Sequence, residues 1–86
     1  MPNNRNAAKA ARQNEKRRLR NRAVRSRVRT AVRMARAALS EKSRDVGIVV
    51  AGAIRSLDKA VTKGVIHRNT AARTKSALAR RLATLG

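Results

Sequence analysis

The stretch VRSRVRTAVRMARAAL, residues 24–39, decides the fold of this chain. Its apolar residues recur at intervals of three and four positions, which places them on one face of an α-helix. This apolar stripe consists of Val24, Val28, Ala31, Val32, Ala35 and Leu39. We expect a second set of residues to cluster on the opposite face, namely Arg18, Arg22, Arg25, Arg29, Arg33 and Arg36. A helix with one apolar face must bury that face against other elements, so the stretch predicts a helical bundle.

Toward the N-terminus the same helix continues without an apolar face. No glycine or proline interrupts residues 3–46, and we therefore expect one helix from about Ala7 to Leu39. At about 1.5 Å per residue, this helix is roughly 50 Å long. Between the proline near the N-terminus and Val24, the only large apolar residue is Leu19. The N-terminal half has no core to join and is predicted to protrude.

Two shorter helices are expected after the first. The apolar positions of the second helix are Val46, Val50, Ile54, Leu57 and Val61. Those of the third helix are Ala71, Leu78, Leu82 and Leu85. Short connections favour antiparallel neighbours. The predicted fold class is all-α, a three-helix bundle with a long, protruding basic N-terminal helix. We expect a single domain over residues 1–86, with residues 1–23 as a basic helical extension and residues 24–86 as the bundle.

Local signals predict how the helices begin and end. Ser43 is expected as the N-cap of the second helix and Asn69 as that of the third. Gly64, after Lys63 at the end of the second helix, is expected in a left-handed conformation. Two glycines inside the second helix, Gly47 and Gly52, are candidates for a close contact between helices.

The charge of the chain points to a polyanionic partner. It carries 23 Lys and Arg residues against four acidic residues, a formal net charge of +19. Thirteen of the basic residues and only one acid, Glu15, lie in residues 1–36. Such a density opposes a compact state unless a polyanion neutralises it, and arginine suits phosphate because its planar fork makes paired hydrogen bonds. The composition therefore predicts nucleic-acid binding.

The residues needed for catalysis or for a metal site are scarce. The chain has one histidine, no cysteine and four scattered acids, which do not make a catalytic triad or a metal cluster. Its four glycines do not form a phosphate-binding loop. We expect no enzymatic activity, no cofactor, no metal and no small-molecule substrate.

The absence of aromatic residues narrows the mode of binding. Domains that stack bases on Phe, Tyr or Trp are excluded, which leaves recognition of backbone and shape by helices. Such recognition suits folded RNA and also DNA, so a nucleoid-associated DNA-binding protein is the alternative function. A membrane-active helix needs bulky apolar residues opposite its charge, and the N-terminal half offers only Leu19. We therefore expect no membrane partner.

The stretch KGVIHRNTAARTKSAL, residues 63–78, resembles the signature of the bacterial small-subunit ribosomal protein twenty family. A second region of resemblance comprises Gln13, Glu15, Lys16, Arg17, Arg18, Arg20, Asn21, Ser26, Arg29 and Thr30. Asn4, Ala8 and Ala10 depart from the family pattern, which more often has Ile, Lys and Arg there. The resemblance covers nearly the whole chain and is weakest in the middle helix.

This resemblance implies a structural protein that binds 16S-type ribosomal RNA directly and supports early assembly of the small subunit. Its location is then the cytoplasmic ribosome, with other ribosomal components nearby. Along the first helix, the residues expected to neutralise RNA phosphates are Lys9, Arg12, Lys16, Arg17, Arg18, Arg20, Arg22, Arg25, Arg29 and Arg33. A second contact surface is expected from Lys63, His67, Arg68, Asn69, Arg73 and Lys75. For His67, two roles stay open: a side chain satisfied by a backbone group or water, or a contact to phosphate or ribose.

Overall fold

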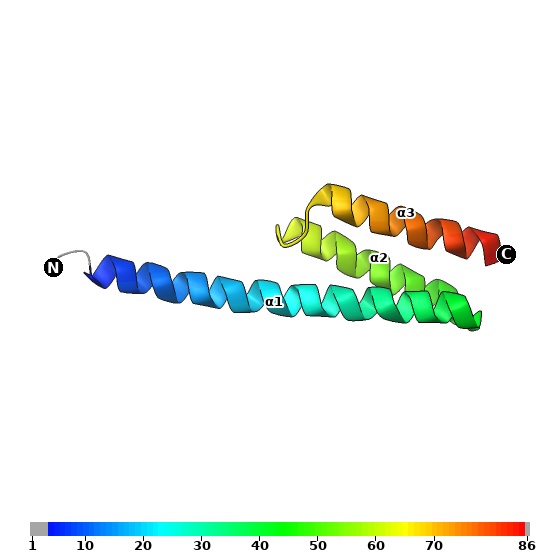
Figure 1. The fold of residues 1–86 in the computed structure, drawn as a ribbon, viewed down its shortest axis with the longest axis horizontal. Coiled ribbons are helices and arrows are strands. Elements are labelled where there is room, and N and C mark those ends of the chain that lie inside the picture. The colour runs from blue at the N-terminus through cyan, green and yellow to red at the C-terminus, as the bar shows by residue number, and fades with distance from the viewer. Residues whose placement is uncertain (1–3, 86) are drawn as a thin grey trace.

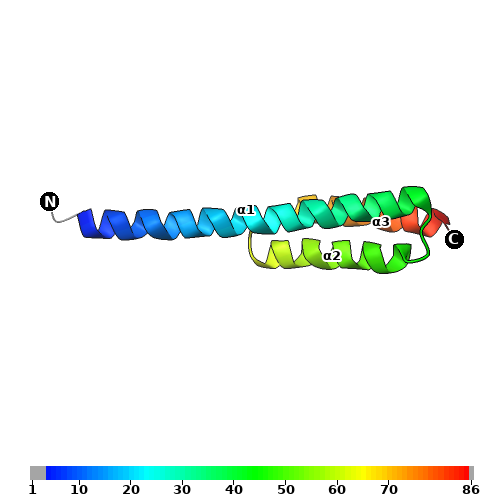
Figure 2. The same cartoon turned by 90° about the horizontal axis from the view of Figure 1, so that it is seen from below.

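The computed structural model describes residues 4–85 and contains three α-helices within them (Figure 1). Helix α1 spans Asn4–Glu41, α2 spans Val46–Thr62 and α3 spans Arg68–Leu85. Each pair of helices is in contact, and successive helices run in opposite directions (Figures 1 and 2). The predicted all-α, three-helix fold with a long first helix is confirmed.

Helix α1 extends well beyond the other two helices at its N-terminal end (Figure 1). The molecule measures 66 × 20 × 14 Å, and its radius of gyration is 17.6 Å. A compact domain of this length has a radius of gyration of about 12 Å. Residues 5–20 are all exposed, and the first buried residue is Val24. The shape therefore follows from the sequence, because the apolar stripe begins only after the middle of α1.

The observed bounds of α1 exceed the predicted ones at both ends. The helix begins at Asn4 rather than Ala7 and ends at Glu41 rather than Leu39. Ser43, predicted to cap α2, lies in the connection, and Asp45 occupies the N-cap position without a side-chain hydrogen bond to the helix. The prediction for Ser43 is wrong because α2 begins only at Val46, so that Asp45 and not Ser43 directly precedes the helix.

The residue that follows α1, Lys42, is a lysine with a left-handed backbone conformation. Lys42 has a φ of 53°, a conformation that side chains with a Cβ rarely adopt. The backbone N–H of the next residue, Ser43, donates a 3.1 Å hydrogen bond to the carbonyl of Ala38. This is the long bond of a Schellman motif, in which glycine usually occupies the left-handed position. The chain therefore holds Lys42 in a strained conformation to end α1.

Helix α2 ends in the same motif with glycine in the left-handed position, as predicted. Gly64 has a φ of 73°, and its N–H donates to the carbonyl of Val61 at 2.9 Å. The N–H of Val65 donates to the carbonyl of Ala60 at 2.9 Å. Val65 itself packs against the core, which is the apolar contact that accompanies this motif.

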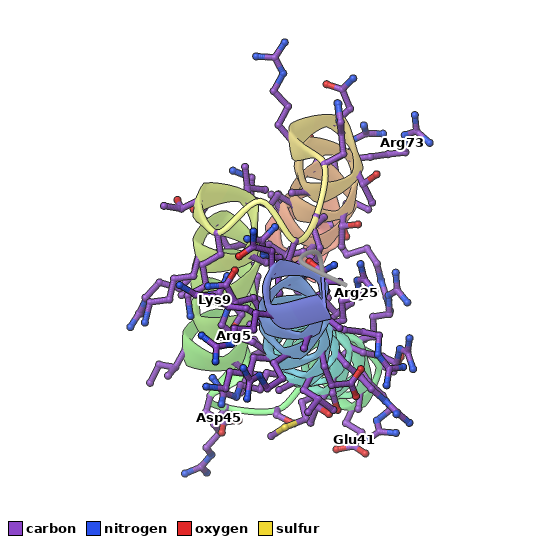
Figure 3. All side chains as sticks on the ribbon, turned by 90° about the vertical axis from the view of Figure 1, so that its left-hand side faces the viewer. Arg5, Lys9, Arg25, Glu41, Asp45 and Arg73 are labelled. Atoms are coloured by element: carbon purple, nitrogen blue, oxygen red, sulfur yellow. The ribbon has the colours of Figure 1, made fainter. Side chains whose placement is uncertain are left out.

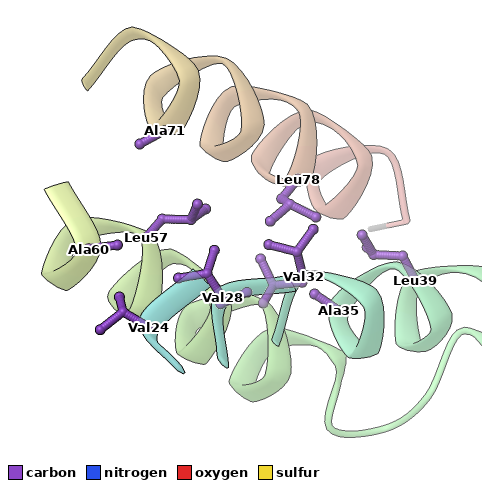
Figure 4. Close-up of a cluster of buried hydrophobic side chains, with 11 residues drawn as sticks. Val24, Val28, Val32, Ala35, Leu39, Leu57, Ala60, Ala71 and Leu78 are labelled. Atoms are coloured by element: carbon purple, nitrogen blue, oxygen red, sulfur yellow. The ribbon is translucent and has the colours of Figure 1, made fainter. Parts of the chain in front are cut away.

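The core is a single apolar cluster between the three helices (Figure 4). Residues 5–85 contain no buried polar or charged side chain. Helix α1 supplies half of the buried residues, and the predicted stripe is confirmed, with Ala31 half-buried and Ala38 as an addition. The complete set is Val24, Val28, Val32, Ala35, Ala38, Leu39, Val50, Ala53, Leu57, Ala60, Ala71 and Leu78.

Small residues of α2 occupy the centre of the bundle. Ala53 and Ala60 are 1% and 0% exposed, and both belong to the core cluster shared by the three helices. Gly47 and Gly52 do not mediate a close contact, because a Cβ added to either would meet no atom within 4 Å. The predicted role of these glycines is wrong, and the buried alanines are the small residues at the core.

Helix α3 leans on α2 and diverges from α1 toward its own N-terminus (Figure 1). Only Ala71 and Leu78 of α3 are buried, while Leu82 and Leu85 pack at the margin of the core. Near the other end of α3, the guanidinium of Arg81 donates a 3.3 Å hydrogen bond to the hydroxyl of Ser40 on α1. The two helices are thus tied together at the C-terminal end of α3.

The two Schellman motifs give a paired prediction for stability. Gly64→Ala forces a Cβ into the left-handed region and is expected to lower the free energy of unfolding by about 1 kcal/mol. Lys42→Gly removes the same strain and is expected to raise it by about 0.5–1 kcal/mol. Urea unfolding followed by circular dichroism measures both changes. Gly52→Ala is the control for the added methyl group, because it lies within a helix and is expected to stabilise the protein. The two changes in the free energy of unfolding need not be equal in size. A stabilising effect of Gly64→Ala would contradict the assignment of strain to a Cβ at this left-handed position.

Candidate nucleic-acid interface

The predicted phosphate-binding residues of α1 all lie on the surface. Every one of these ten side chains, from Lys9 to Arg33, is exposed. Seen along the axis of α1 from its N-terminal end, basic side chains radiate in several directions, with Arg5 and Lys9 on one side and Arg25 on the other (Figure 3). An extension charged nearly all round can contact phosphates on more than one side.

Ion pairs neutralise few of these charges. Within the described residues, 4–85, the structure contains two ion pairs, Arg18 with Glu15 and Lys75 with Asp58. The other two acids, Glu41 and Asp45, lie beside the turn between α1 and α2 (Figure 3). The basic extension therefore faces outward with almost no internal counterion.

The Arg18–Glu15 pair is local and exposed. The guanidinium of Arg18 donates hydrogen bonds of 2.8 and 3.2 Å to the two carboxylate oxygens of Glu15. These bonds, together with the charge of Arg18, hold the pKa of Glu15 below its ordinary value. The support that the pair gives to α1 is present above the ordinary carboxyl pKa and is lost as the pH falls through the lowered one. Water and salt screen this exposed pair.

Lys75 joins two helices as well as adding charge. Its ammonium donates a 2.7 Å hydrogen bond to the carboxylate of Asp58, so the pair links α3 to α2. Lys75 was predicted to contact RNA, and the structure shows that its side chain already has an anionic partner. Among the predicted residues of the second surface, it therefore has a structural role besides any contact with RNA.

The remaining residues of the second surface gather around the start of α3. Lys63, His67, Arg68, Asn69 and Arg73 are all exposed on the α2–α3 connection and the first turns of α3. This connection lies at the end of the bundle from which the extension of α1 emerges (Figure 1). The fold therefore places the two predicted surfaces next to one another, although they are far apart in the sequence.

His67 caps helix α3. Its Nδ1 accepts a 3.1 Å hydrogen bond from the backbone N–H of Asn69, and its carbonyl accepts one from the N–H of Ala71. A side-chain acceptor that meets the free N–H groups of the first turn is the function of an N-cap. Asn69 was predicted to be the cap, which is wrong because α3 begins at Arg68, two residues before the start that a cap at Asn69 implies. The first of the two roles left open for His67 is thus observed.

The arginines of the bundle half of α1 do not all lie opposite the apolar stripe. Arg29, Arg33 and Arg36 line one wall of a groove between α1 and α3, and Val28 and Val32 form part of its floor. At about 100° per residue, Arg36 is only about 80° from Val28 around the helix. The prediction that these arginines occupy the opposite face is wrong; they flank the stripe on the side of α3.

The far wall of this groove comes from residues that the sequence did not single out. Ile66, Thr70 and Thr74 line it, and Leu57 of α2 completes the floor. The available signal was the spacing of the two threonines, four positions apart on one face of α3, with an apolar residue just before the helix. Nothing in that pattern identifies a groove before the helices are docked.

The described part of the chain shows no alternative site for chemistry. Residues 4–85 contain no group of three or more histidine or acidic side chains that could hold a metal ion. Within the same residues, no helix has the length and apolar character needed to cross a bilayer. Fold and surface together define a class: an all-helical protein whose long first helix protrudes from a small bundle and exposes basic side chains along its length.

Comparison with known proteins identifies the family within this class. The family model for ribosomal protein S20 matches residues 2–83. The small ribosomal subunit protein bS20 of Thermobifida fusca is 51% identical over 83 residues, which cover 95% of this chain and 90% of that protein. The protein of the same name from Streptomyces griseus is 49% identical over 86 residues, covering 99% and 98%. The chain belongs to the ribosomal protein S20 family and is a structural protein, not an enzyme.

The cap on α3 gives a test that separates the two roles of His67. His67→Ala removes the acceptor and is expected to lower the free energy of unfolding by about 1 kcal/mol, whereas His67→Asn supplies another cap and largely preserves it. Urea unfolding of the three proteins measures the difference. The affinity of each protein for RNA is measured in parallel at about 0.2 M salt. Loss of affinity in His67→Asn despite full stability would show that the imidazole also contacts RNA.

Proposed function

We propose that this protein binds small-subunit, 16S-type ribosomal RNA directly through phosphate contacts and supports early assembly of the subunit. The observation that carries the proposal is the exposed, uncompensated charge of α1, which protrudes from the bundle beside a second basic surface. Membership of the S20 family supports ribosomal RNA as the polyanion, since the similar proteins are named as small ribosomal subunit proteins. The proposed place of action is the ribosome in the cytoplasm, near other ribosomal components.

The proposed contacts fall into two groups with different tasks. Along the protruding helix, arginine and lysine side chains neutralise phosphates and release counterions, which supplies most of the affinity. Around the start of α3, the exposed groups Lys63, Arg68, Asn69 and Arg73 contact the RNA from a second direction. Two surfaces that are held in a fixed arrangement by the bundle favour one RNA shape over others. We propose residues 1–23 as the RNA-embedded extension and residues 24–86 as the bundle of a single domain.

Binding measurements distinguish this function from that of a nucleoid-associated DNA-binding protein. The purified chain is titrated with transcribed small-subunit ribosomal RNA, with duplex DNA as competitor, over a series of salt concentrations. Saturation at one copy per RNA that persists in excess DNA is the expected result. Equal displacement by DNA would overturn the proposal, because a purely electrostatic binder does not discriminate between polyanions.

A single arginine on α1 tests the phosphate contacts. Arg25→Ala is expected to weaken RNA binding modestly and to reduce the slope of log affinity against log salt by about one unit. Arg44→Ala is the matched control, because Arg44 is an exposed arginine beside the acids of the α1–α2 turn. Its slope is expected to stay close to that of the unaltered protein. Equal slopes for Arg25→Ala and the unaltered protein would contradict a phosphate contact at Arg25.

A further inference from the structure

The groove between α1 and α3 is unlike the rest of the basic surface. It has a volume of about 400 Å³ and opens where α3 diverges from α1. Its floor is part of the core, because all three floor residues are buried: Val28 and Val32 on α1 are 7% and 8% exposed, and Leu57 on α2 is 2% exposed. The apolar stripe of α1 thus forms part of the groove floor at Val28 and Val32, which lie in the core cluster with Leu57 (Figure 4). The groove combines an apolar floor with a charged wall.

The two walls offer different chemistry. Arg29, Arg33 and Arg36 are exposed along one wall, and no ion pair within residues 4–85 involves them. Thr70 and Thr74 stand on the other wall, where the Thr74 hydroxyl donates to the carbonyl of Thr70 and keeps acceptor capacity. No acidic residue lines the groove. Its occupant should therefore carry negative charge and hydrogen-bonding groups together with a flat or apolar part.

A paired RNA helix does not have this combination at its surface. Its phosphates can meet the arginines, but its bases are stacked inside and cannot reach the floor. An unpaired nucleotide in a bulge or loop exposes its base, its ribose hydroxyl and its phosphate together. Proteins usually stack such a base on aromatic side chains or on arginine planes, and this chain has no aromatic residue. The aliphatic floor and the arginine wall are the surfaces on which a base can lie.

We propose that this groove receives one unstacked nucleotide of the bound RNA, with its base against Val28, Val32 and Ile66 and its phosphate on the arginine wall. The inference deepens the proposed function and rests on it. It gives the bundle a role in selecting the RNA, which phosphate neutralisation alone does not provide. Only an RNA with an unpaired nucleotide at the right place can contact the basic extension and the groove together. The threonine wall then faces the ribose or the base edge.

Methyl resonances of isoleucine test the groove directly. The chain has three isoleucines, of which Ile66 lines the groove and Ile48, 77% exposed, lies outside it on α2. The protein has no Phe, Tyr or Trp, and the measurement is repeated in His67→Asn, which removes its single imidazole, so that a ring-current shift of a methyl resonance must come from an RNA base. The probes are an RNA hairpin with a single-nucleotide bulge and the fully paired hairpin of the same stem. The bulged hairpin is expected to shift the Ile66 methyl resonance and leave Ile48 unchanged, and the paired hairpin should shift neither.

A substitution on the groove wall supplies the second arm. Thr70→Leu places a larger side chain in the groove, and Thr84→Leu makes the same change at an exposed position near the end of α3. Leucine favours helix more than threonine does, so neither variant is expected to unfold. Affinity for the bulged hairpin should fall by about tenfold in Thr70→Leu, the order of one lost stacking contact, and stay constant in Thr84→Leu.

The outcomes separate the groove from the general function. If both hairpins bind equally, with no shift of Ile66 and no effect of Thr70→Leu, the groove inference is overturned while RNA binding by the extension stands. If the chain shows no preference for small-subunit ribosomal RNA over duplex DNA, the proposed function fails, and the inference fails with it.

Discussion

The apolar seam on α1 between Val24 and Leu39 is the contact on which the other two helices depend. Within residues 5–85, six of the twelve buried residues belong to it, and α2 and α3 add four and two. A core this small, made of valines, leucines and alanines, buries little surface relative to the charge that surrounds it. The seam therefore fixes where the bundle ends and where the exposed helix begins, and through that boundary it determines which basic residues are free to meet a partner.

Charge and packing act against one another in this molecule. A formal net charge of +19 favours expansion, and only two ion pairs within residues 4–85 counter it. A polyanion that binds the folded form stabilises it by mass action, and this stabilisation grows with the logarithm of one plus the ratio of its concentration to the dissociation constant. The same ligand removes the repulsion. Binding of the proposed RNA would thus be coupled energetically to folding, even where the helices themselves do not change.

Much of the fold was predictable because helical periodicity is a local property. The stripe on α1, the apolar positions of α3 and the left-handed Gly64 all follow from spacing or residue type. Lys42 could not be predicted in the same conformation, because the sequence there has no glycine to mark a left-handed position. The cap by His67 and the groove beside Arg33 depended on exact helix ends and on how α3 leans, which are properties of the assembled bundle. The residues that touch RNA remain predictions.

One uninterrupted helix joins the charged extension to the bundle, and this continuity restricts how the chain can change in length. Each residue inserted into or removed from α1 turns everything before it by about 100° and shifts it by about 1.5 Å. A single insertion near Ala23 would rotate the basic groups of the extension away from their alignment with the groove and the start of α3, while leaving the core intact. An insertion of seven residues, about two turns, would nearly restore the direction but not the reach. Length variation should therefore accumulate at the two termini and in the connections. The number of residues in the middle of α1 should stay constant, because it sets both the distance and the direction of the extension relative to the bundle.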